Sequence, residues 1–377
     1  MVKNKQIESS YSKSSLKNLV TVAPPTYLFG TIGHIGFPKS CHAPSIEHVD
    51  GTKFLVVWFQ GSREGAPDVS IWSIEIDFLS KTRAVPKEIF KLENSAHWNP
   101  VLFKDQKGKI HIYFKVGEKI DSWVTWHATY NNGEWSAAEK IKSCFSRITG
   151  RGPVRSKPIF LSNGDWIAPS SIEETIEYLD TYYGKKPLSE WRAFVDRSIN
   201  FGKSWKASSL IDFDREKFGH QPYDDSRKFG GIIQPTLWES SSGNVHMLLR
   251  STACKIFRSD SLNYGKKWSP AYETSLPNNN SAIDIAKSED GVLCMAYNPI
   301  AENWGPRTPL SVSFSFGEGT KWTKPINIAS GDGSYSYPSI VPYGAGFVIV
   351  FSSNRLSIVL TYVSYGKNFI EEVKNDQ

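Results

Sequence analysis

The eight residues SINFGKSW at positions 198–205 recur as SLNYGKKW at 261–268 and as SFGEGTKW at 315–322. Every copy has Ser first, Gly fifth and Trp eighth; the first two copies have Asn third, where the last has Gly. Shorter forms are TYNNGEW at 129–135 and SYGKNF at 364–369. A capping Asn and a Gly with positive φ are typical of a β-hairpin turn, which the Trp side chain then covers. Copies spaced about 50–70 residues apart indicate a four-stranded unit repeated around a propeller.

Short β-rich runs lie between these motifs, and most of them follow a polar turn that contains Gly. The clearest runs are FLVVWF at 54–59, IHIYF at 110–114, VHMLL at 245–249, VLCMAY at 292–297 and GFVIVF at 346–351. Together with the motifs they give units near residues 40–90, 95–145, 153–212, 230–275, 278–328 and 333–372. The sequence therefore predicts an all-β, six-bladed β-propeller of four-stranded antiparallel blades.

The division into repeated units also sets the expected domain boundaries. Residues 1–24 are predicted to form a polar N-terminal segment, and residues 25–377 a single propeller domain. The segment near 26–32 is expected to complete the last blade, because a closed ring leaves no exposed strand edge. The polar, Tyr-rich stretch 173–188 is expected to contain the few helical turns.

The composition limits the class of protein. Of the 377 residues, 40% are hydrophobic and 22% are charged, which argues against a disordered chain and against a membrane bundle. The net charge of +6 is compatible with an anionic substrate and too small to indicate nucleic-acid binding. The four Cys residues lack metal-ligand spacing, and nothing in the sequence requires a metal or a cofactor.

The sequence has no apolar run long enough for a transmembrane helix or for the core of a signal peptide. We therefore expect a cytoplasmic location. Peripheral association with the inner membrane, or with a membrane-associated partner protein, stays open.

Candidate functional residues lie beside the first strand of each unit, because the inner strands of a propeller meet at one mouth of the central channel. Arg250 and Arg307 stand out, since they occupy matching places in two successive units. Packing roles remain open for all of the candidates. The others are His42, Arg63, Glu64, Asp68, Trp98, Lys157, Gln234, Asn280, Tyr335 and Tyr337.

The repeat motif and the order of these residues resemble the sialidase family, with its BNR repeats or Asp-boxes, from about residue 37 to residue 370. In that family three arginines hold the sugar carboxylate, an Asp is the acid/base, and a Tyr polarised by a Glu is the nucleophile. The resemblance implies that Arg250 and Arg307 are the second and third arginines. It also implies that Asp68 is the acid/base and Tyr335 the nucleophile, with Tyr337 as the neighbouring candidate.

Two positions depart from the family pattern. The first arginine belongs to an Arg-Ile-Pro stretch, and this place reads His42-Ala43-Pro44. The Glu that activates the tyrosine is replaced by Gln234. Another base therefore has to activate the tyrosine, and Glu64 or His42 is the nearest candidate.

The resemblance implies a retaining exo-glycosidase that removes a terminal α-linked 2-keto-3-deoxy acid, sialic acid or Kdo, from a glycan or lipopolysaccharide. Arginines pair bidentately with a planar carboxylate, and a neutral Tyr hydroxyl avoids the repulsion that an anionic nucleophile would meet there. Asp68 would then need a raised pKa, supplied by burial in the channel mouth. Two alternatives stay open: a uronate polysaccharide lyase that uses His42 with Tyr335, and a non-catalytic propeller that binds acidic glycans.

Overall fold

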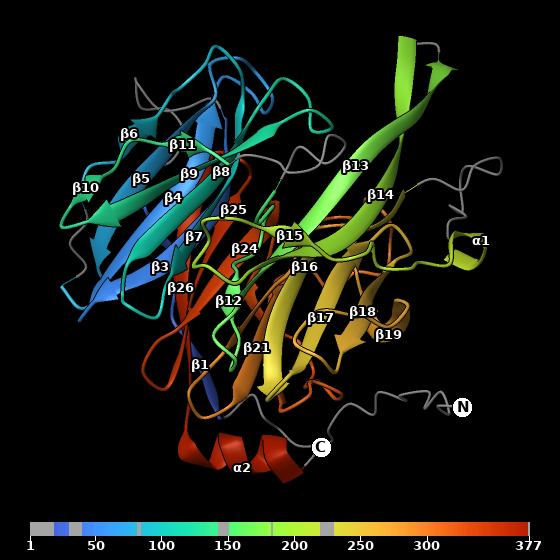
Figure 1. Ribbon diagram of the computed structural model, residues 1–377. Coiled ribbons are helices and arrows are strands. Elements are labelled where there is room, and N and C mark those ends of the chain that lie inside the picture. Colours follow the sequence, from blue (N-terminus) through green and yellow to red (C-terminus); the bar gives the residue numbers. More distant parts are fainter. Residues whose placement is uncertain are drawn as a thin grey trace.

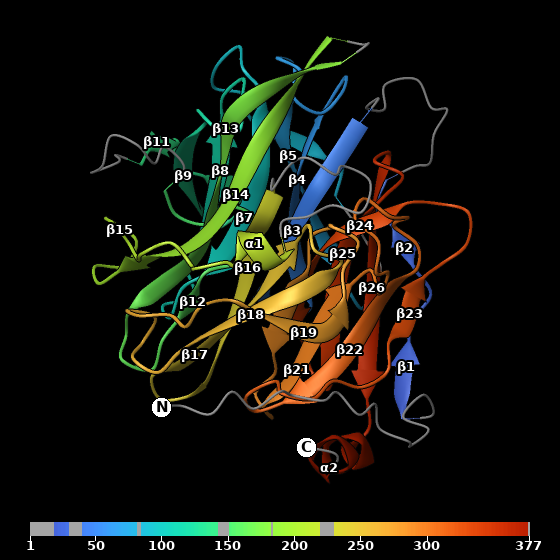
Figure 2. The same ribbon diagram turned by 90° about the vertical axis from the view of Figure 1, so that its right-hand side faces the viewer.

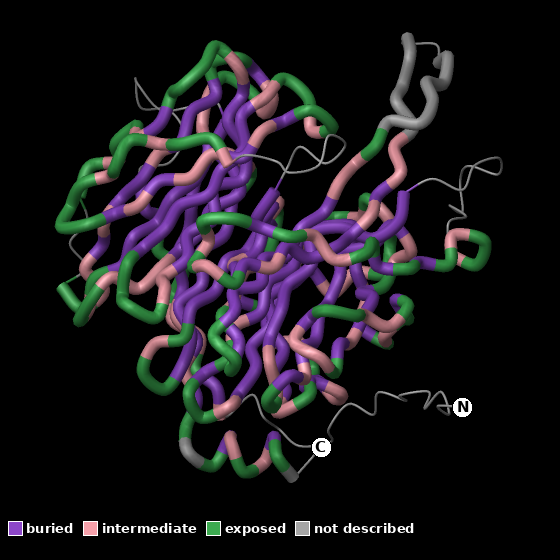
Figure 3. Tube along the Cα trace, in the orientation of Figure 1, coloured by how far each residue is buried: buried purple, intermediate pink, exposed green. Residues whose placement is uncertain are grey.

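The computed structural model describes residues 19–29, 40–80, 84–141, 151–181, 184–218 and 230–375. Nearly all regular structure in these residues is β-strand, and the helices are α1 (Arg215–Phe218) and α2 (Lys367–Asn375) (Figure 1, Figure 2). Buried residues follow the strands, and exposed residues gather at the hairpin ends (Figure 3). No helix of the described residues is both long and apolar enough to cross a membrane.

Two sheets contain four antiparallel strands each. One consists of β3 (Ser40–Asp50), β4 (Lys53–Gly61), β5 (Ser70–Asp77) and β6 (Lys87–Phe90). The other consists of β20 (Asp284–Lys287), β21 (Val292–Tyr297), β22 (Leu310–Phe316) and β23 (Ile326–Ala329). These two sheets have the arrangement that the sequence predicts for a blade.

Two further sheets contain five strands. The first consists of β7 (His97–Lys104), β8 (Ile110–Val116), β9 (Val124–Asn131), β10 (Glu134–Trp135) and β11 (Glu139–Lys140). The second consists of β24 (Tyr335–Pro342), β25 (Gly346–Ser353), β26 (Ser357–Tyr365), β1 (Val20–Val22) and β2 (Thr26–Tyr27).

The remaining sheet has eight strands. Its first part is β12 (Ile159–Phe160), β13 (Trp166–Thr181), β14 (Gly184–Ser198) and β15 (Lys206–Ala207). Its second part is β16 (Gly230–Ser241), β17 (Asn244–Ser251), β18 (Lys255–Ser261) and β19 (Tyr272–Pro277). The β13–β14 hairpin extends well beyond its neighbours (Figure 1).

The predicted all-β, propeller-like fold is confirmed, but the prediction of six separate four-stranded blades is wrong. The described strands form five sheets, because β14 and β16 pair in parallel at Trp191 and Gly231 and so join two expected blades. A Cβ on Gly231 would lie 2.4 Å from the carbonyl oxygen of Trp191, so only glycine permits this approach. One strand of each sheet contacts one strand of the next, in the order β16, β20, β24, β3 and β7, and we call these five the inner strands.

The N-terminal residues complete the sheet of β24 to β26. Thr26 is paired with Leu360 on β26, as expected of a strand that closes the last blade, while residues 30–32 lie outside the described residues. Val20 is also paired on β26, within the stretch that the sequence analysis assigned to the N-terminal segment. The expectation of helical turns in residues 173–188 is wrong for the described part of this stretch, because residues 173–181 belong to β13 and residues 184–188 to β14.

The repeat motif forms the turn that its residues predict. In the second copy, Ser261 Oγ accepts a hydrogen bond from the Gly265 amide at 3.0 Å, and Asn263 Oδ1 accepts one from the Lys267 amide at 2.9 Å. The indole of Trp268 donates to the Gly265 carbonyl at 3.0 Å. Gly265 has a φ of 70°, and a Cβ there would lie 2.3 Å from Ile167 in the neighbouring part of the sheet. The motif glycine therefore provides both the turn and a close contact.

Four inner strands share a deformation that the sequence analysis did not anticipate. Ala43, Asn99, Gln234 and Tyr337 have φ between 43° and 58°, and Pro follows each of them. The register of each strand with its neighbour shifts at the same place. Left-handed backbone at a non-glycine residue costs about 1–3 kcal/mol, and such bulges re-aim side chains near functional sites. The inner ends of these strands therefore do not follow simple side-chain alternation.

Candidate functional site

Tyr337 on β24 is the centre of the candidate site. Its side chain is buried, and its hydroxyl accepts a hydrogen bond from Nη1 of Arg250 at 3.1 Å. The guanidinium carbons of Arg155 and Arg307 lie 5.3 and 5.4 Å from the centre of the Tyr337 ring. Three cationic side chains from separate parts of the chain therefore surround one phenol.

Arg250 on β17 is oriented by two amides that the sequence analysis singled out. Its Nε donates to Asn280 Oδ1 at 2.8 Å, and its Nη1 donates to Gln234 Oε1 at 3.0 Å. The ring centres of Trp191 and Trp304 lie 5.1 and 5.9 Å from the guanidinium carbon. These neutral groups fix the guanidinium plane without cancelling its charge.

Within the described residues, no carboxylate forms a salt bridge with Arg155, Arg250 or Arg307. Arg155 instead donates to the backbone carbonyls of Tyr337 and Pro338 at 2.6 and 2.8 Å. Arg307 donates to Ser336 Oγ at 3.3 Å. The charges of Asp284 and Glu64 act on Arg155 and Arg307, and that of Arg250 acts on Glu173, but none of these carboxylates is in salt-bridge contact with them. A guanidinium without such a contact forms strong charge-assisted hydrogen bonds when an anion arrives. The cluster is therefore chemically suited to a ligand carboxylate.

The arginines also change the acidity of Tyr337. Burial, the largest single influence, would raise the pKa of its hydroxyl, but the charges of Arg250 and Arg307 act in the opposite direction. The hydrogen bond from Arg250 adds to them, and the net result is a pKa below the usual value. Arg250 and Arg307 thus stabilise the phenolate form of Tyr337 relative to an ordinary tyrosine, at the site where Gln234 stands in place of the glutamate of the family pattern.

His42 on β3 lies against Tyr337, with 4.2 Å between the ring centres. Its Nδ1 lies 2.8 Å from Ser352 Oγ, and its buried Nε2 has no hydrogen-bond partner among the described residues. Burial, and then the charges of Arg355 and three further arginines, hold the pKa of His42 well below its usual value. The histidine that replaces the first family arginine is therefore neutral.

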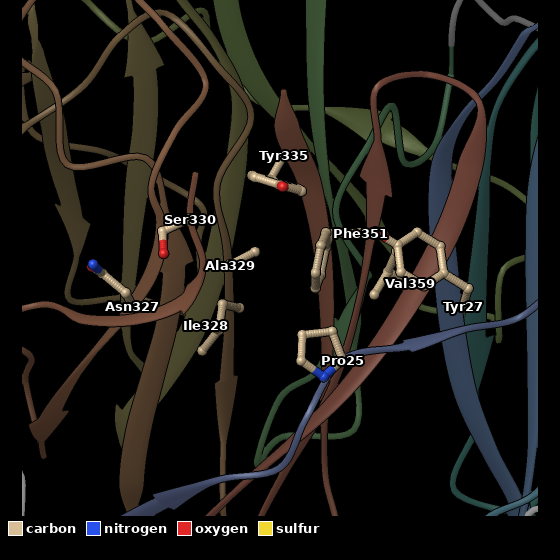
Figure 4. Close-up of a pocket in the computed structure, with 9 residues that line it drawn as sticks. All are labelled: Pro25, Tyr27, Asn327, Ile328, Ala329, Ser330, Tyr335, Phe351 and Val359. Carbon is tan, nitrogen blue, oxygen red and sulfur yellow. The ribbon is translucent and has the colours of Figure 1, made fainter. Parts of the chain in front are cut away.

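Tyr335 lies away from this cluster. Its ring is edge-on to that of Phe351, and both line a pocket with Pro25, Tyr27 and Val359 between β23, β24 and β26 (Figure 4). Regular strand alternation would place Tyr335 and Tyr337 on one face of β24, but the bulge between Ser336 and Ser339 separates them. The structure brings Tyr337, and not Tyr335, to the arginines.

The loop between β4 and β5 contains Arg63, Glu64 and Asp68. Asp68 is exposed and accepts hydrogen bonds from the hydroxyl and the amide of Ser62, at 2.8 and 2.9 Å. These bonds, the side-chain one first, lower the pKa of Asp68, so the raised pKa expected from burial is not found. Arg63 is exposed. Glu64 is half-buried and forms an ion pair with Arg355.

Trp98 and Lys157 have their contacts elsewhere. The indole of Trp98 donates to the Gly117 carbonyl at 2.9 Å and packs in the hydrophobic core with Phe59. Lys157 Nζ donates to Ser339 Oγ at 2.6 Å and lies 3.9 Å from Asp284. Both side chains therefore support the inner strands. Among the described residues neither is hydrogen-bonded to Tyr337, although Trp98 belongs to the hydrophobic cluster that also contains Tyr337.

Sequence reasoning assigned no role to several residues that the structure places around Tyr337 and Arg250: Arg155, Glu173, Trp191, Trp304 and Arg355. Glu173 lies on β13, where burial raises its pKa and the charge of Arg250 lowers it to a smaller extent. One feature of the sequence could have indicated Tyr337 rather than Tyr335. Pro follows Tyr337, as it follows the residue with positive φ in the three other deformed inner strands.

The described residues contain no group of three or more His, Cys, Asp or Glu side chains that could hold a metal ion.

Comparison with protein families gives one match. The model described as BNR repeat-like domain matches residues 52–350. No curated protein sequence matches the chain.

Many solved structures have a similar fold. A Dyadobacter fermentans protein of unknown function aligns with a TM-score of 0.69 and 12% identity, covering 92% of this chain and 99% of that one. A mutant of NanB sialidase from Streptococcus pneumoniae gives 0.66 and 11%, covering 92% and 71%. Trypanosoma rangeli sialidase in complex with sialic acid gives 0.62 and 14%, covering 94% and 60%. At these identities the likeness concerns the fold alone.

Proposed function

Because this chain belongs to the BNR repeat-like domain family, we propose that it is a retaining exo-glycosidase. Its proposed substrate is a terminal α-linked 2-keto-3-deoxy acid, sialic acid or Kdo, on a glycan or lipopolysaccharide. The observation that carries the proposal is the group of Arg155, Arg250 and Arg307 around Tyr337, with no carboxylate paired to any of the three among the described residues. A sugar carboxylate would form charge-assisted hydrogen bonds with these guanidinium groups.

The carboxylate of the substrate would bind to Arg250, which donates to the Tyr337 hydroxyl, and to Arg307, whose guanidinium carbon lies 5.4 Å from the centre of the Tyr337 ring. Gln234 and Asn280 keep the Arg250 guanidinium in place and have no charge to compete with the ligand. Arg155 is engaged with the backbone of Tyr337 and Pro338, so we assign it to positioning the nucleophile.

Tyr337 is the proposed nucleophile. The anomeric carbon of a 2-keto acid carries the carboxylate, which would repel an anionic Asp or Glu nucleophile. The neighbouring arginines favour the phenolate, so Tyr337 would attack as an anion stabilised by the groups that also bind the substrate. The proton donor would come from the β4–β5 loop, in which Asp68 and Glu64 are the two candidates.

One assay tests the proposal. The protein is incubated with α-sialosides, Kdo-containing lipopolysaccharide and uronate polysaccharides, and the products are analysed for free 2-keto acid and for unsaturated, ultraviolet-absorbing sugar. Release of a 2-keto acid, first as its α-anomer by NMR, is the expected result. Failure of the folded protein to bind any of these acidic sugars would overturn the proposal.

A uronate lyase is the second candidate, and the contact between His42 and Tyr337 supports it. A neutral imidazole with an unpartnered Nε2 beside a tyrosine has the composition of a proton-abstracting pair. An unsaturated product would favour this reaction. Tight binding without any product would instead favour an acidic-glycan-binding protein.

A further inference from the structure

Arg355 is a fourth arginine near the candidate site, and it differs from the other three in having a carboxylate partner. Its guanidinium forms an ion pair with Glu64 of the β4–β5 loop. Both side chains are about one-third exposed, at 37% for Arg355 and 34% for Glu64. The pair is therefore accessible from solvent, unlike the buried guanidinium of Arg250.

The backbone of Arg355 is fixed next to the position where the family pattern lacks an arginine. Asn354 and Arg355 form the β25–β26 turn, with φ of 52° and 57°. The Cys41 amide donates to the Arg355 carbonyl at 2.7 Å, and the Asn354 amide donates to the Ser334 carbonyl at 2.7 Å. These bonds attach the turn to the starts of β3 and β24, beside His42.

Electrostatic interactions place both partners close to the candidate site. Arg355 is the arginine whose charge most strongly lowers the pKa of His42, and it also lowers the pKa of Arg307, although burial is the larger cause in both groups. Glu64 acts in turn on Tyr337, Arg307 and Glu173. The guanidinium that could complete the carboxylate site is therefore present, but Glu64 occupies it.

We propose that a bound sugar carboxylate takes Arg355 from Glu64, and that the released Glu64 is the proton donor of the reaction. This inference rests on the proposed function of the same site. In it, Arg355 supplies from the β25–β26 turn the positive charge that His42 does not supply from β3. Exchange of one carboxylate for another at this partly exposed guanidinium costs little, because ion pairs accessible to solvent contribute only about 0–1 kcal/mol.

Release changes the surroundings of Glu64. Exchange removes the guanidinium beside Glu64 and brings in the ligand carboxylate, whose charge adds to that of Glu173. As the phenolate of Tyr337 bonds to the anomeric carbon, the bond from that carbon to the glycosidic oxygen breaks, and the Glu64 proton moves to that oxygen. Water then attacks the anomeric carbon, the bond to Tyr337 breaks, and Glu64 accepts the proton of the water. Proton donation by Glu64 to the glycosidic oxygen is thus coupled to the binding of an acidic substrate.

Binding measurements with Glu64→Gln test the exchange directly, because the exchange predicts that this variant binds the free acid more tightly. The probes are free N-acetylneuraminic acid and free Kdo, with their methyl esters as uncharged controls, in isothermal titration calorimetry. Glu64→Gln removes the competitor for Arg355, so the free acid should bind several-fold more tightly. Arg355→Gln should weaken its binding about tenfold, the loss of one charge-assisted hydrogen bond, and Arg355→Lys should restore part of it. The esters should be affected little by either change.

The control variant is Glu273→Gln, which breaks the similarly exposed ion pair with Lys255 on β18 and should leave binding unchanged. Weaker or unchanged binding of the acids by Glu64→Gln would overturn the exchange. Unchanged binding by Glu64→Gln together with lost binding by Arg250→Lys would leave the proposed function standing and remove only this inference. If Arg250→Lys also binds as the wild type does, the carboxylate site itself is wrong.

The proton-donor role has a separate kinetic test. Glu64→Gln should slow hydrolysis of natural glycosides about 10²–10⁴-fold and affect aryl glycosides with good leaving groups much less. Asp68→Asn, a change in the same loop, should affect both substrates equally and weakly. The opposite result, in which Asp68→Asn alone is selective for poor leaving groups, would assign the proton donor to Asp68 and overturn this role for Glu64.

Discussion

Tyr335 and Tyr337 are separated by one residue on β24, yet their rings contact different groups. The Tyr335 ring centre lies 6.2 Å from that of Phe351, whereas that of Tyr337 lies 4.2 Å from His42. The hydroxyl of Tyr337 also accepts the hydrogen bond from Arg250. Positive φ at Tyr337 breaks the alternation that would otherwise place both rings on one face. The two tyrosines therefore form a matched pair for experiment.

Phenylalanine substitutions at these two positions should have opposite outcomes. Tyr337→Phe removes the oxygen proposed as the nucleophile while the ring still packs on His42, so turnover should fall by at least about 10³-fold with substrate binding retained. Tyr335→Phe should keep most of the activity, because its hydroxyl is not directed at the arginines. Steady-state kinetics and calorimetric binding on both variants provide the test. An inactive Tyr335→Phe beside an active Tyr337→Phe would contradict the assignment.

Replacing Arg250 or Arg307 with Lys should separate charge from geometry. Lysine keeps the positive charge but loses the planar pair of donors, so an acidic sugar should bind about tenfold to a hundredfold more weakly. Arg197→Lys is the control, since Arg197 pairs with Asp165 and not with the candidate site. Dissociation constants and melting temperatures are measured together. Unchanged affinity, or affinity lost only through unfolding, would mean that these arginines are structural.

The repeat motif and the strands could be predicted because their physical causes are local. Ser, Asn, Gly and Trp within eight residues define a turn whose hydrogen bonds close among themselves, as they do at residues 261–268. The five β-rich runs are strands for the same reason. Arg250 could be found as well, because its place in the unit is set by the length of β17 after the turn.

The remaining features depend on contacts between distant residues. The joining of two blades requires Gly231 to meet Trp191, and the two are separated by the 39 residues between them in the chain. Arg155 contributes through the carbonyls of Tyr337 and Pro338, more than 180 residues away. Arg355 stands in a turn that resembles any other turn in the sequence. Only the tertiary structure shows which of these residues meet.

Acidification should destabilise the protein partly through His97. Its Nδ1 donates to the Ser95 carbonyl and its Nε2 accepts from the Leu92 amide, both at 3.0 Å, so the neutral ring is required. Burial is the main cause that lowers the pKa of His97 to about 4. Between pH 6.5 and 4 the unfolded chain binds a proton that the folded chain does not, so the free energy of unfolding decreases as the pH is lowered. The loss should be on the order of 3 kcal/mol and complete near pH 4.

Chemical denaturation as a function of pH measures this effect. His97→Gln keeps a donor and an acceptor without titrating, so the decline in the free energy of unfolding between pH 6.5 and 4 should become shallower. His48→Gln, at a half-buried position on β3, is the matched control. Equal slopes in the wild type and in His97→Gln would exclude His97 as a source of the acid sensitivity.

Alanine substitutions of two motif glycines should lower the free energy of unfolding by different amounts, because only one of them creates a steric clash. Gly133 and Gly265 have φ of 90° and 70°, so alanine is strained at both, but a Cβ at 133 meets nothing within 4 Å whereas one at 265 lies 2.3 Å from Cδ1 of Ile167. Gly133→Ala should cost about 1 kcal/mol of unfolding free energy. Gly265→Ala should cost about 1–3 kcal/mol more, as overpacking does.

Ile167→Val removes the clashing Cδ1 and by itself should cost about 0.5–1.5 kcal/mol of unfolding free energy. Combined with Gly265→Ala it should be cheaper than the sum of the two single changes, a coupling that a double-mutant cycle measures by denaturation. Strict additivity would show that the motif glycine is required for its backbone conformation alone, and that contact between the two halves of the eight-stranded sheet tolerates a methyl group at this turn.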